Sequence, residues 1–302
     1  MPRGPWYANP HLLLVLTMLF WSGNAICGRL AGGLVPPVSL ATWRWTLAFL
    51  VVVPFAARWV WRDRALLLRH WRLIVLLGLL GSTAYNLLIY FALSHTTAVN
   101  VTLVGGLGPL MVPVVAWMLD RTRIGGRQLL ALGFCLAGVM VVIGRGDPTR
   151  LAALHVGPGD LFTLAAVVDW AFYAVLLRRL PPGLHPLAFL ATTFGVGVLG
   201  HVPFYIWEWV SGARMVVTPL SLGLIVYVGL FPSILSFMFW NRAVAQVGAT
   251  TAGLFMNLVP LFAAGLAYMI LGEHLAPYHV VAFLCVFTGI AVGARIKAPR
   301  QG

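Results

Sequence analysis

Two ionisable side chains interrupt long apolar stretches of this sequence. Asp169 is the only carboxylate deep within such a stretch, and Arg44 is the corresponding basic residue in another. A charged side chain at the centre of a bilayer costs about 2.5–3.5 kcal/mol on insertion scales and rarely faces lipid. We therefore expect Asp169 to face a cavity or a cation. Such a carboxylate could carry a proton, bind a substrate amine, or act as a structural partner.

Arg44 allows three interpretations. It could hold the carboxylate of a substrate, or it could pair with Asp169. Its long stem could also let the guanidinium snorkel to the nearer surface, because Arg44 lies only seven residues into its apolar stretch. Charge pairing or proton coupling by Arg44 and Asp169 is therefore one hypothesis among these, and the sequence leaves it open.

Pro109 and Pro260 stand at equivalent points of two similar segments, 151 residues apart. Each is predicted to fall in the middle of an apolar helix, where proline removes a backbone donor and kinks the helix. In a membrane the freed carbonyl must find a partner or line a water-filled cavity. Their appearance at one offset favours a pair of hinges over static kinks that only improve packing.

Aromatic and amide side chains gather in the same apolar stretches. A pocket for a bulky, mostly apolar solute with a polar end needs apolar walls and a few fixed hydrogen-bonding groups. The residues expected to line such a pocket, together with Asp169, are Trp21, Asn24, Tyr85, Asn86, Tyr90, Thr102, Trp170, Tyr173, Phe237, Trp240 and Asn257. The histidines and cysteines are too scattered to indicate a metal site, and we expect no cofactor.

The composition predicts that membrane-spanning helices position these residues. The 302-residue chain is 61% apolar and 9% charged, whereas soluble proteins are about 25% charged. The net charge of +13 does not indicate nucleic acid here, because the basic residues lie in short gaps between apolar runs, as in membrane loops. Runs long enough to cross a bilayer are predicted at 11–30, 38–57, 72–91, 97–119, 127–144, 158–177, 186–209, 219–241, 249–271 and 277–295.

The sequence also repeats itself. At an offset of 151 the matches include Gly78 with Gly229, Ser82 with Ser233, and Ala98 with Ala249; at an offset of 149 they include Trp21 with Trp170, Arg29 with Arg178, and Pro37 with Pro186. Matches of Trp, Arg and Pro in one order indicate a duplication, with halves at 1–150 and 151–302. Five helices in each half make the second half enter the membrane from the opposite side. Inverted repeats of this kind are typical of secondary transporters, with a midplane substrate site and alternating access.

Lysine and arginine predict the orientation. With ten helices, fifteen of these residues lie on the side of the N-terminus and four on the other, while Arg44 stays inside a helix. The positive-inside rule then places both termini in the cytoplasm. We expect a multi-pass protein of the bacterial inner membrane, whose partners are lipid, a small solute and, in a coupled mechanism, protons. The oligomeric state does not follow from the sequence.

Several motifs resemble EamA-type proteins of the drug/metabolite transporter superfamily. They are Trp21-Ser22-Gly23-Asn24 followed by Arg29, the block from Ala92 through Thr97-Ala98 to Pro109, the block from Asn241-Arg242-Ala243 through Gly248-Ala249 to Pro260, and Leu271-Gly272-Glu273 before a last helix with Gly289. The likeness covers nearly the whole chain and departs from the family pattern at Asp120-Arg121-Thr122. It implies a ten-helix metabolite transporter, and the narrower likeness is to bacterial YddG-type exporters of aromatic and bulky amino acids.

We therefore expect an alternating-access exporter of amino acids or related small metabolites, and not an enzyme. An integral-membrane enzyme acting on lipid is one alternative, but the seven acids are scattered and no Ser/His or His/Asp group stands out. A passive metabolite channel is the other alternative, which the inverted repeats disfavour only mildly.

Overall fold

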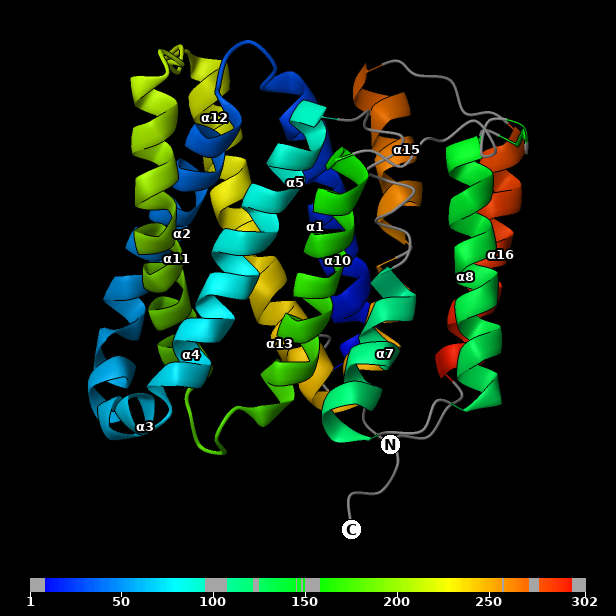
Figure 1. Ribbon diagram of the computed structural model, residues 1–302, viewed down its shortest axis with the longest axis horizontal. Coiled ribbons are helices and arrows are strands. Elements are labelled where there is room, and N and C mark those ends of the chain that lie inside the picture. The colour runs from blue at the N-terminus through cyan, green and yellow to red at the C-terminus, as the bar shows by residue number, and fades with distance from the viewer. Residues whose placement is uncertain are drawn as a thin grey trace.

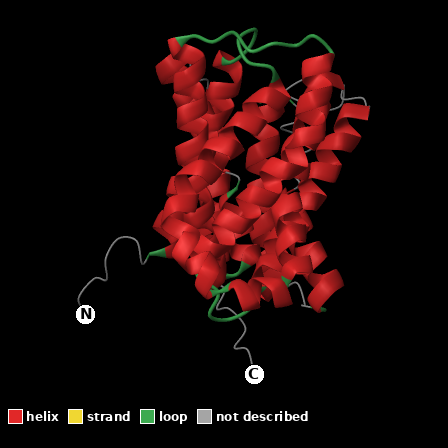
Figure 2. Ribbon diagram, turned by 90° about the vertical axis from the view of Figure 1, so that its left-hand side faces the viewer, coloured by secondary structure: helices red, strands yellow, loops and turns green. Residues whose placement is uncertain are grey.

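The computed structural model describes residues 9–95, 108–121, 125–144, 146–147, 149, 158–256, 258–271 and 277–294. Every regular element within these ranges is a helix, and the helices form one bundle (Figure 1, Figure 2). The all-helical class expected from the sequence is thus confirmed for the part of the chain that the structure describes.

The elements follow the predicted runs closely. The first half contains α1 (Pro10–Leu30), α2 (Pro37–Arg62), α3 (Arg64–Arg69), α4 (Trp71–Gly78), the π-helix η2 (Leu79–Ala84), α5 (Tyr85–His95), α7 (Gly108–Asp120) and α8 (Gly126–Gly144). The second half contains α10 (Pro158–Leu176), the 3-10 helix η3 (Leu177–Arg179), α11 (Pro186–Val210), α12 (Pro219–Val228), the π-helix η4 (Gly229–Leu235), α13 (Ser236–Val247), α14 (Ala249–Phe255), α15 (Leu258–Leu271) and α16 (Pro277–Ala294).

Six helical spans among the described residues are long and apolar enough to cross a membrane. They are Pro10–Gly28, Pro37–Arg62, Trp71–Ile89, Leu161–Arg179, Pro186–Val210 and Pro219–Val247. Shorter apolar helices are Met111–Asp120, Leu261–Ile270 and Val280–Gly289. The fourth predicted run is described only from Gly108, and the ninth divides into α14 and α15. The count of ten crossings therefore stays a prediction.

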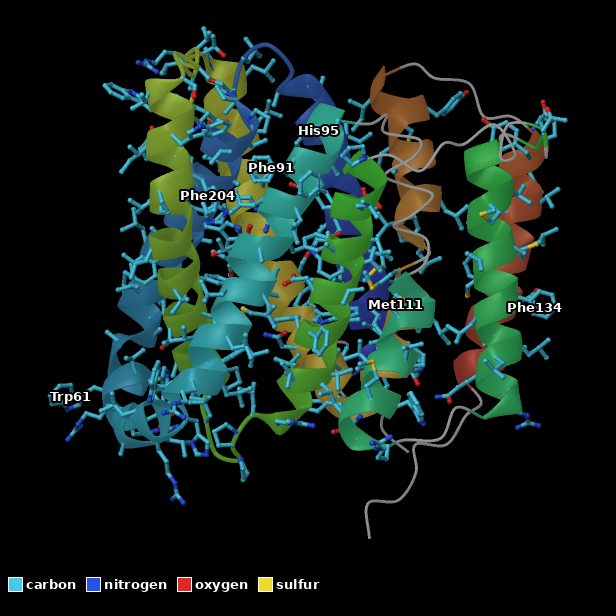
Figure 3. All side chains as sticks on the ribbon, in the orientation of Figure 1. Trp61, Phe91, His95, Met111, Phe134 and Phe204 are labelled. Atoms are coloured by element: carbon cyan, nitrogen blue, oxygen red, sulfur yellow. The ribbon has the colours of Figure 1, made fainter. Side chains whose placement is uncertain are left out.

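Large apolar side chains cover the outside of the bundle. Leu199 is 72% exposed, Phe55 69% and Met269 71%. Phe134 likewise points outward from α8 (Figure 3). Patches of this kind are unfavourable in water, but in a membrane the lipid tails around them are as apolar as a protein interior. The exposed surface is therefore that of a protein surrounded by lipid.

Carboxyl groups join α2 and α11 at both ends. Glu208, near the end of α11, accepts the backbone N–H groups of Val38 and Ser39 at 2.9 and 2.7 Å and the Ser39 hydroxyl at 2.6 Å. At the other end Asp63, directly after α2, accepts the backbone N–H of His185, the N-cap of α11, at 2.8 Å. The first N–H groups of a helix have no partner within the helix, so each carboxyl group satisfies donors at the start of a helix. The two helices consequently run antiparallel.

Corresponding contacts recur in the two halves. Helix α1 packs against α13 and α15, as α10 packs against α5 and α7, while α2 lies on η4 and α11 lies on η2. Helices α8 and α16 form a further pair at one edge of the bundle (Figure 1). There an added Cβ on Gly289 would lie 2.5 Å from the Cys135 sulfur, so only glycine permits this approach. The matched contacts agree with a pseudo-two-fold relation between the halves.

The described arginines are unevenly distributed along the bundle. One end carries Arg58, Arg62, Arg64, Arg69, Arg72, Arg178 and Arg179. The contact between Asp63 and His185 brings the segments that bear these residues to the same end. Arg214 lies at the other end, after α11. This distribution follows the alternation of loops that the sequence predicts, and the assignment of the basic end to the cytoplasm stays a prediction.

Candidate functional site

Equivalent residues of the two halves meet in the interior of the bundle. Trp21 of α1 and Trp170 of α10, paired by the offset of 149, contact each other edge to face with ring centroids 5.1 Å apart. The same offset pairs Trp45 of α2 with Phe194 of α11, whose rings are 5.0 Å apart. Residues related by a two-fold axis touch only beside that axis. These contacts therefore lie between the halves, where the sequence predicts the substrate pocket.

Further rings complete what we term the central aromatic cluster. Its members are Trp21, Trp45, Tyr85, Trp170, Tyr173, Phe194, Phe237 and Trp240. Trp240 lies 5.4 Å from Trp21 and 5.6 Å from Trp170, and Tyr173 lies 5.0 Å from Trp170. Ring pairs at about 4.5–7 Å attract one another beyond the gain from burial. Trp170 is only 4% exposed and Trp240 is fully buried, so the rings themselves fill this region in the conformation described.

Several polar atoms in and beside the cluster have no hydrogen-bond partner among the described residues. They are Nε1 of Trp45, Trp170 and Trp240, Oγ of Ser236 and Nδ2 of Asn241. The Oδ1 of Asn241, by contrast, accepts from the Tyr173 hydroxyl at 3.0 Å. Indole and amide N–H groups can only donate, and each one buried unpaired costs about 1–3 kcal/mol. The cluster therefore suits a ligand that combines an apolar body with acceptor oxygens, such as a carboxylate.

A π-helix lies beside the cluster in each half. Segments η2 and η4 occupy equivalent positions, with Ser82 and Ser233 paired by the offset of 151. In a π-helix the backbone bonds run over five residues, which leaves carbonyls outside the regular ladder, and such turns are frequent at functional sites. The Trp21 indole N–H donates to one of these, Pro232 O, at 3.2 Å. Neither π-helix was predicted from the sequence; the paired serines and Pro232 are the signals that could have indicated them.

Arg44 lies buried against η4. It is 4% exposed, donates from Nε to Ser233 Oγ at 3.0 Å and from Nη1 to Asn24 Oδ1 at 3.4 Å, and lies over the Trp45 ring at 5.0 Å. Ser233 in turn donates to Val228 O at 2.7 Å. The snorkelling interpretation is therefore wrong for this conformation, because the guanidinium turns inward and connects α2 with α1 and η4.

Asp169 lies on α10, immediately before Trp170, and is 9% exposed. Its Oδ2 has no hydrogen-bond partner among the residues described. A buried carboxyl oxygen in this position can accept from a proton-bearing group, an amine or another cation. The roles considered for Asp169 in the sequence analysis stay predictions.

His201 of α11 is another ionisable side chain at membrane depth, and it is fully buried. Its Nδ1 lies 2.8 Å from Gly197 O. Because a carbonyl only accepts, Nδ1 must carry the hydrogen, and Nε2 has no partner within the described part of the chain.

The other predicted pocket residues take several positions. Tyr85 belongs to the cluster, with its ring 5.3 Å from that of Trp170. Asn86 is buried and donates from Nδ2 to Ser82 O of η2 at 2.9 Å, and its place in the pocket stays a prediction. The Tyr90 side chain, Thr102 and Asn257 lie outside the described residues.

The structure describes α7 from Gly108, so Pro109 is its second described residue, and the position of Pro109 within a longer helix lies outside the described residues. Pro260 is the third residue of α15. In the first turn of a helix a missing N–H breaks no bond within that helix. The second half instead shows a break between α14 and α15, just before Pro260. The prolines inside described helices are Pro54, Pro113, Pro203 and Pro232, of which Pro54 and Pro203 share the offset of 149. A hinge role for Pro109 and Pro260 stays a prediction.

Comparison with known proteins agrees with this architecture. The EamA-like transporter family matches residues 9–144 and, separately, residues 157–294. The uncharacterized transporter YyaM of Bacillus subtilis strain 168 is 25% identical over 96% of this chain and 95% of its own length. A "probable terminal-alkyne amino-acid exporter" of Streptantibioticus cattleyicolor is 26% identical over 96% of each chain. A protein of known crystal structure that is 20% identical in sequence superposes on this chain with a TM-score of 0.76. The match covers 94% of this chain and 95% of the other, so the two proteins share the fold.

Proposed function

Because this chain belongs to the EamA-like transporter family, we propose that it exports amino acids with aromatic or other bulky apolar side chains, or related small metabolites, by alternating access. The chain is a multi-pass integral membrane protein that transports small molecules, and it is not an enzyme. The lipid-modifying enzyme considered from the sequence is thereby excluded. A passive channel is the alternative that an experiment must distinguish.

The central aromatic cluster is the observation that carries the proposed substrate class. Its rings lie where equivalent residues of the two halves touch, as in the contact of Trp21 with Trp170. Aromatic walls favour an apolar or aromatic side chain, and the unpaired indole N–H groups of Trp45 and Trp240 favour a carboxylate. An amino acid with a bulky side chain presents both groups on one small molecule.

The packed interior supports a carrier over a channel. Trp45, Phe194 and Trp240 are fully buried, so a solute can pass only when the rings separate. We assign the repeats to residues 1–150 and 151–302, in inverted orientation with ten crossings, because the contacts of α1 correspond to those of α10. Alternation between an inward-open and an outward-open arrangement of the two halves would expose the cluster to one side of the membrane and then to the other. We assign the arginine-rich end to the cytoplasmic side of a bacterial inner membrane. The direction of export rests on the likeness to exporters and not on this orientation.

Two likenesses support the narrower substrate assignment. The YddG-type resemblance in the sequence implies aromatic and bulky amino acids. The Streptantibioticus cattleyicolor relative is named a "probable terminal-alkyne amino-acid exporter" and aligns over 96% of its length, which supports export of an amino acid. Both agree with the chemistry of the cluster.

Transport by purified protein in proteoliposomes tests the proposal. Labelled tryptophan, phenylalanine, leucine and glutamate are compared, with and without a pH gradient. We expect saturable transport of the first three, and acceleration of labelled efflux by unlabelled substrate on the opposite side. Transport that does not saturate, with no such exchange, would indicate a channel. Transport of none of these amino acids would refute the substrate class.

A matched pair of variants ties transport to the cluster. Trp170→Phe keeps an aromatic ring but removes the indole N–H, and a hydrogen bond to a charged group contributes about 1.5–3 kcal/mol. We expect KM for tryptophan to rise about tenfold or more. Trp207→Phe, at a ring that is 58% exposed, is the control and should leave KM unchanged. Equal KM values for the two variants would show that the Trp170 indole N–H does not bind the substrate.

A further inference from the structure

A second feature lies at the basic end of the bundle, away from the central aromatic cluster. Residues 58–72 run from the end of α2 through α3 to the start of α4. We term this segment the arginine–tryptophan surface. Its basic and aromatic members are Arg58, Trp59, Trp61, Arg62, Arg64, Arg69, Trp71 and Arg72, and all five arginines are exposed. Figure 3 shows Trp61 pointing away from the bundle at this end.

The one acidic residue of the segment cannot neutralise these charges. Asp63 accepts from Arg62 Nε at 2.6 Å and Nη2 at 3.1 Å, and its Oδ2 also accepts the backbone N–H of His185. These bonds hold the pKa of the Asp63 carboxyl below its usual range, with the Arg62 hydrogen bond as the largest cause. The Asp63 carboxylate is therefore already bound to Arg62 and to the backbone of His185 at the start of α11.

The remaining four arginines of the surface have no acidic partner in the part of the chain that the structure describes. Within the described residues, no carboxylate lies within 4.0 Å of Arg58, Arg64, Arg69 or Arg72. At the same end, by contrast, Asp120 pairs with Arg179 at 2.8 Å. The surface therefore presents four uncompensated guanidinium groups along one short stretch of chain.

Tryptophan rings order these guanidinium groups. Arg64 lies 4.2 Å above the Trp61 ring, Arg58 lies 4.6 Å above Trp59, and Arg72 lies 5.7 Å from Trp71. A ring covers a face of the planar guanidinium and leaves in-plane N–H groups that can donate, although Nη1 of Arg64 already donates to Trp61 O at 2.9 Å. Such a fork of donors fits two oxygens of a phosphate. Stacking thus prepares the arginines for an oxyanion without neutralising them.

The same surface also exposes apolar groups. Trp61, at the end of the span Pro37–Arg62, is 70% exposed, and Trp71, at the start of the span Trp71–Ile89, is 54% exposed; Leu68, between the two spans, is 71% exposed. Tryptophan favours the boundary between headgroups and acyl chains, where its ring is buried and its N–H stays wet. A soluble anion would satisfy the arginines but leave these side chains in water. A phospholipid satisfies both.

We propose that the arginine–tryptophan surface binds the phosphate groups of anionic phospholipids in the adjacent membrane leaflet. The arginines hold the headgroup phosphates, while Trp61, Leu68 and Trp71 enter the acyl boundary beside them. A basic side chain near an anionic lipid surface contributes about 1 kcal/mol, a factor of roughly five in the association constant. The binding site is independent of the central cluster and of the transported substrate.

Lipid association measured directly tests this inference. Purified protein is reconstituted in phosphatidylcholine vesicles that contain a trace of spin-labelled phosphatidylglycerol or spin-labelled phosphatidylcholine. The fraction of label that the protein immobilises gives the relative association constant of the two lipids. We expect phosphatidylglycerol to be preferred several-fold by the unmodified protein, and salt to reduce that preference. Equal association of the two lipids would overturn the proposal.

Matched double variants locate the site. Arg64→Gln with Arg72→Gln should lower the several-fold preference to near one, because each arginine contributes up to about fivefold. The control replaces two exposed arginines elsewhere, Arg127→Gln with Arg214→Gln, and should leave the preference unchanged. Arg64→Lys with Arg72→Lys keeps the charges that orient loops in the membrane but loses the forked donors, so its loss should be smaller.

The outcomes separate lipid from other occupants. If the Arg64 and Arg72 variants bind phosphatidylglycerol as the unmodified protein does, or if the control loses as much, the site is not on this surface. If the surface instead receives an acidic segment of another protein, the unmodified protein shows no lipid preference in purified form. Displacement of the labelled lipid by millimolar inorganic phosphate alone would show a general anion site, and would equally overturn the proposal.

Discussion

Removal of the Glu208 carboxyl group should destabilise the bundle more than the loss of an ordinary helix cap. Glu208 is 7% exposed and accepts hydrogen bonds from two backbone N–H groups and the Ser39 hydroxyl at the start of α2. The N-cap residue of α2 is Pro36, whose side chain makes no capping bond. The cap of α2 is therefore provided by α11, 170 residues away in the sequence.

The magnitude follows from the donors left behind. Glu208→Ala orphans the N–H groups of Val38 and Ser39, which are 4% and 6% exposed. At about 1–3 kcal/mol for each buried unpaired donor, we expect a loss of about 4 kcal/mol in the free energy of unfolding. Glu208→Gln keeps one acceptor oxygen and turns its amide toward the second N–H, so we expect about 2 kcal/mol.

Equilibrium unfolding in mixed detergent micelles, with SDS as denaturant and helix content as the signal, measures these losses. The control is Thr218→Ala, which removes a local capping box at the start of α12 and should cost about 1 kcal/mol. If Glu208→Ala costs no more than Thr218→Ala, the α2 donors have other partners. The joint between α2 and α11 would then not depend on this carboxyl group.

Further predictions concern topology, coupling, hinges and acid stability. A reporter at the C-terminus should read cytoplasmic and one near Thr149 extracytoplasmic; both on one side would refute the inverted ten-helix topology. Asp169→Asn should abolish pH-driven export but spare substrate exchange if Asp169 carries a proton, and should abolish both if it binds a substrate amine; normal rates in both modes would exclude either role. Joint replacement of Pro109 and Pro260 by Ala should slow transport while expression is retained, and unchanged turnover would leave them a packing role. The pKa of Asp63 is lowered in the folded state, so its carboxylate stabilises the fold above the pKa of the unfolded chain, about 3.9, and this contribution is lost as the pH falls through the lower folded pKa. In Asp63→Asn, the free energy of unfolding should therefore fall less steeply below about pH 4.

Local sequence was sufficient to predict most of the helices. In a bilayer the backbone must satisfy its own hydrogen bonds, so an apolar run of sufficient length becomes a helix whatever its neighbours are. The run predicted at 38–57 is α2, and the run predicted at 186–209 is α11. The offsets of 149 and 151 also predicted the correspondence between halves that the helix contacts now display. Even the pairing of Trp21 with Trp170 was visible in the sequence, although their contact was not.

Tertiary structure decided which groups meet and where the backbone departs from the regular helix. The contact of Glu208 with α2, the position of Arg44 against Ser233, and the π-helices η2 and η4 depend on segments far apart in the chain. Periodicity and composition carry no information on such partners, because an apolar helix can turn any face toward its neighbours. The sequence left the direction of the Arg44 side chain open, and only the hydrogen bonds that Arg44 donates to Ser233 and Asn24 showed that it turns inward. Sequence therefore determined the helices and their repeat, and packing between the halves determined the site.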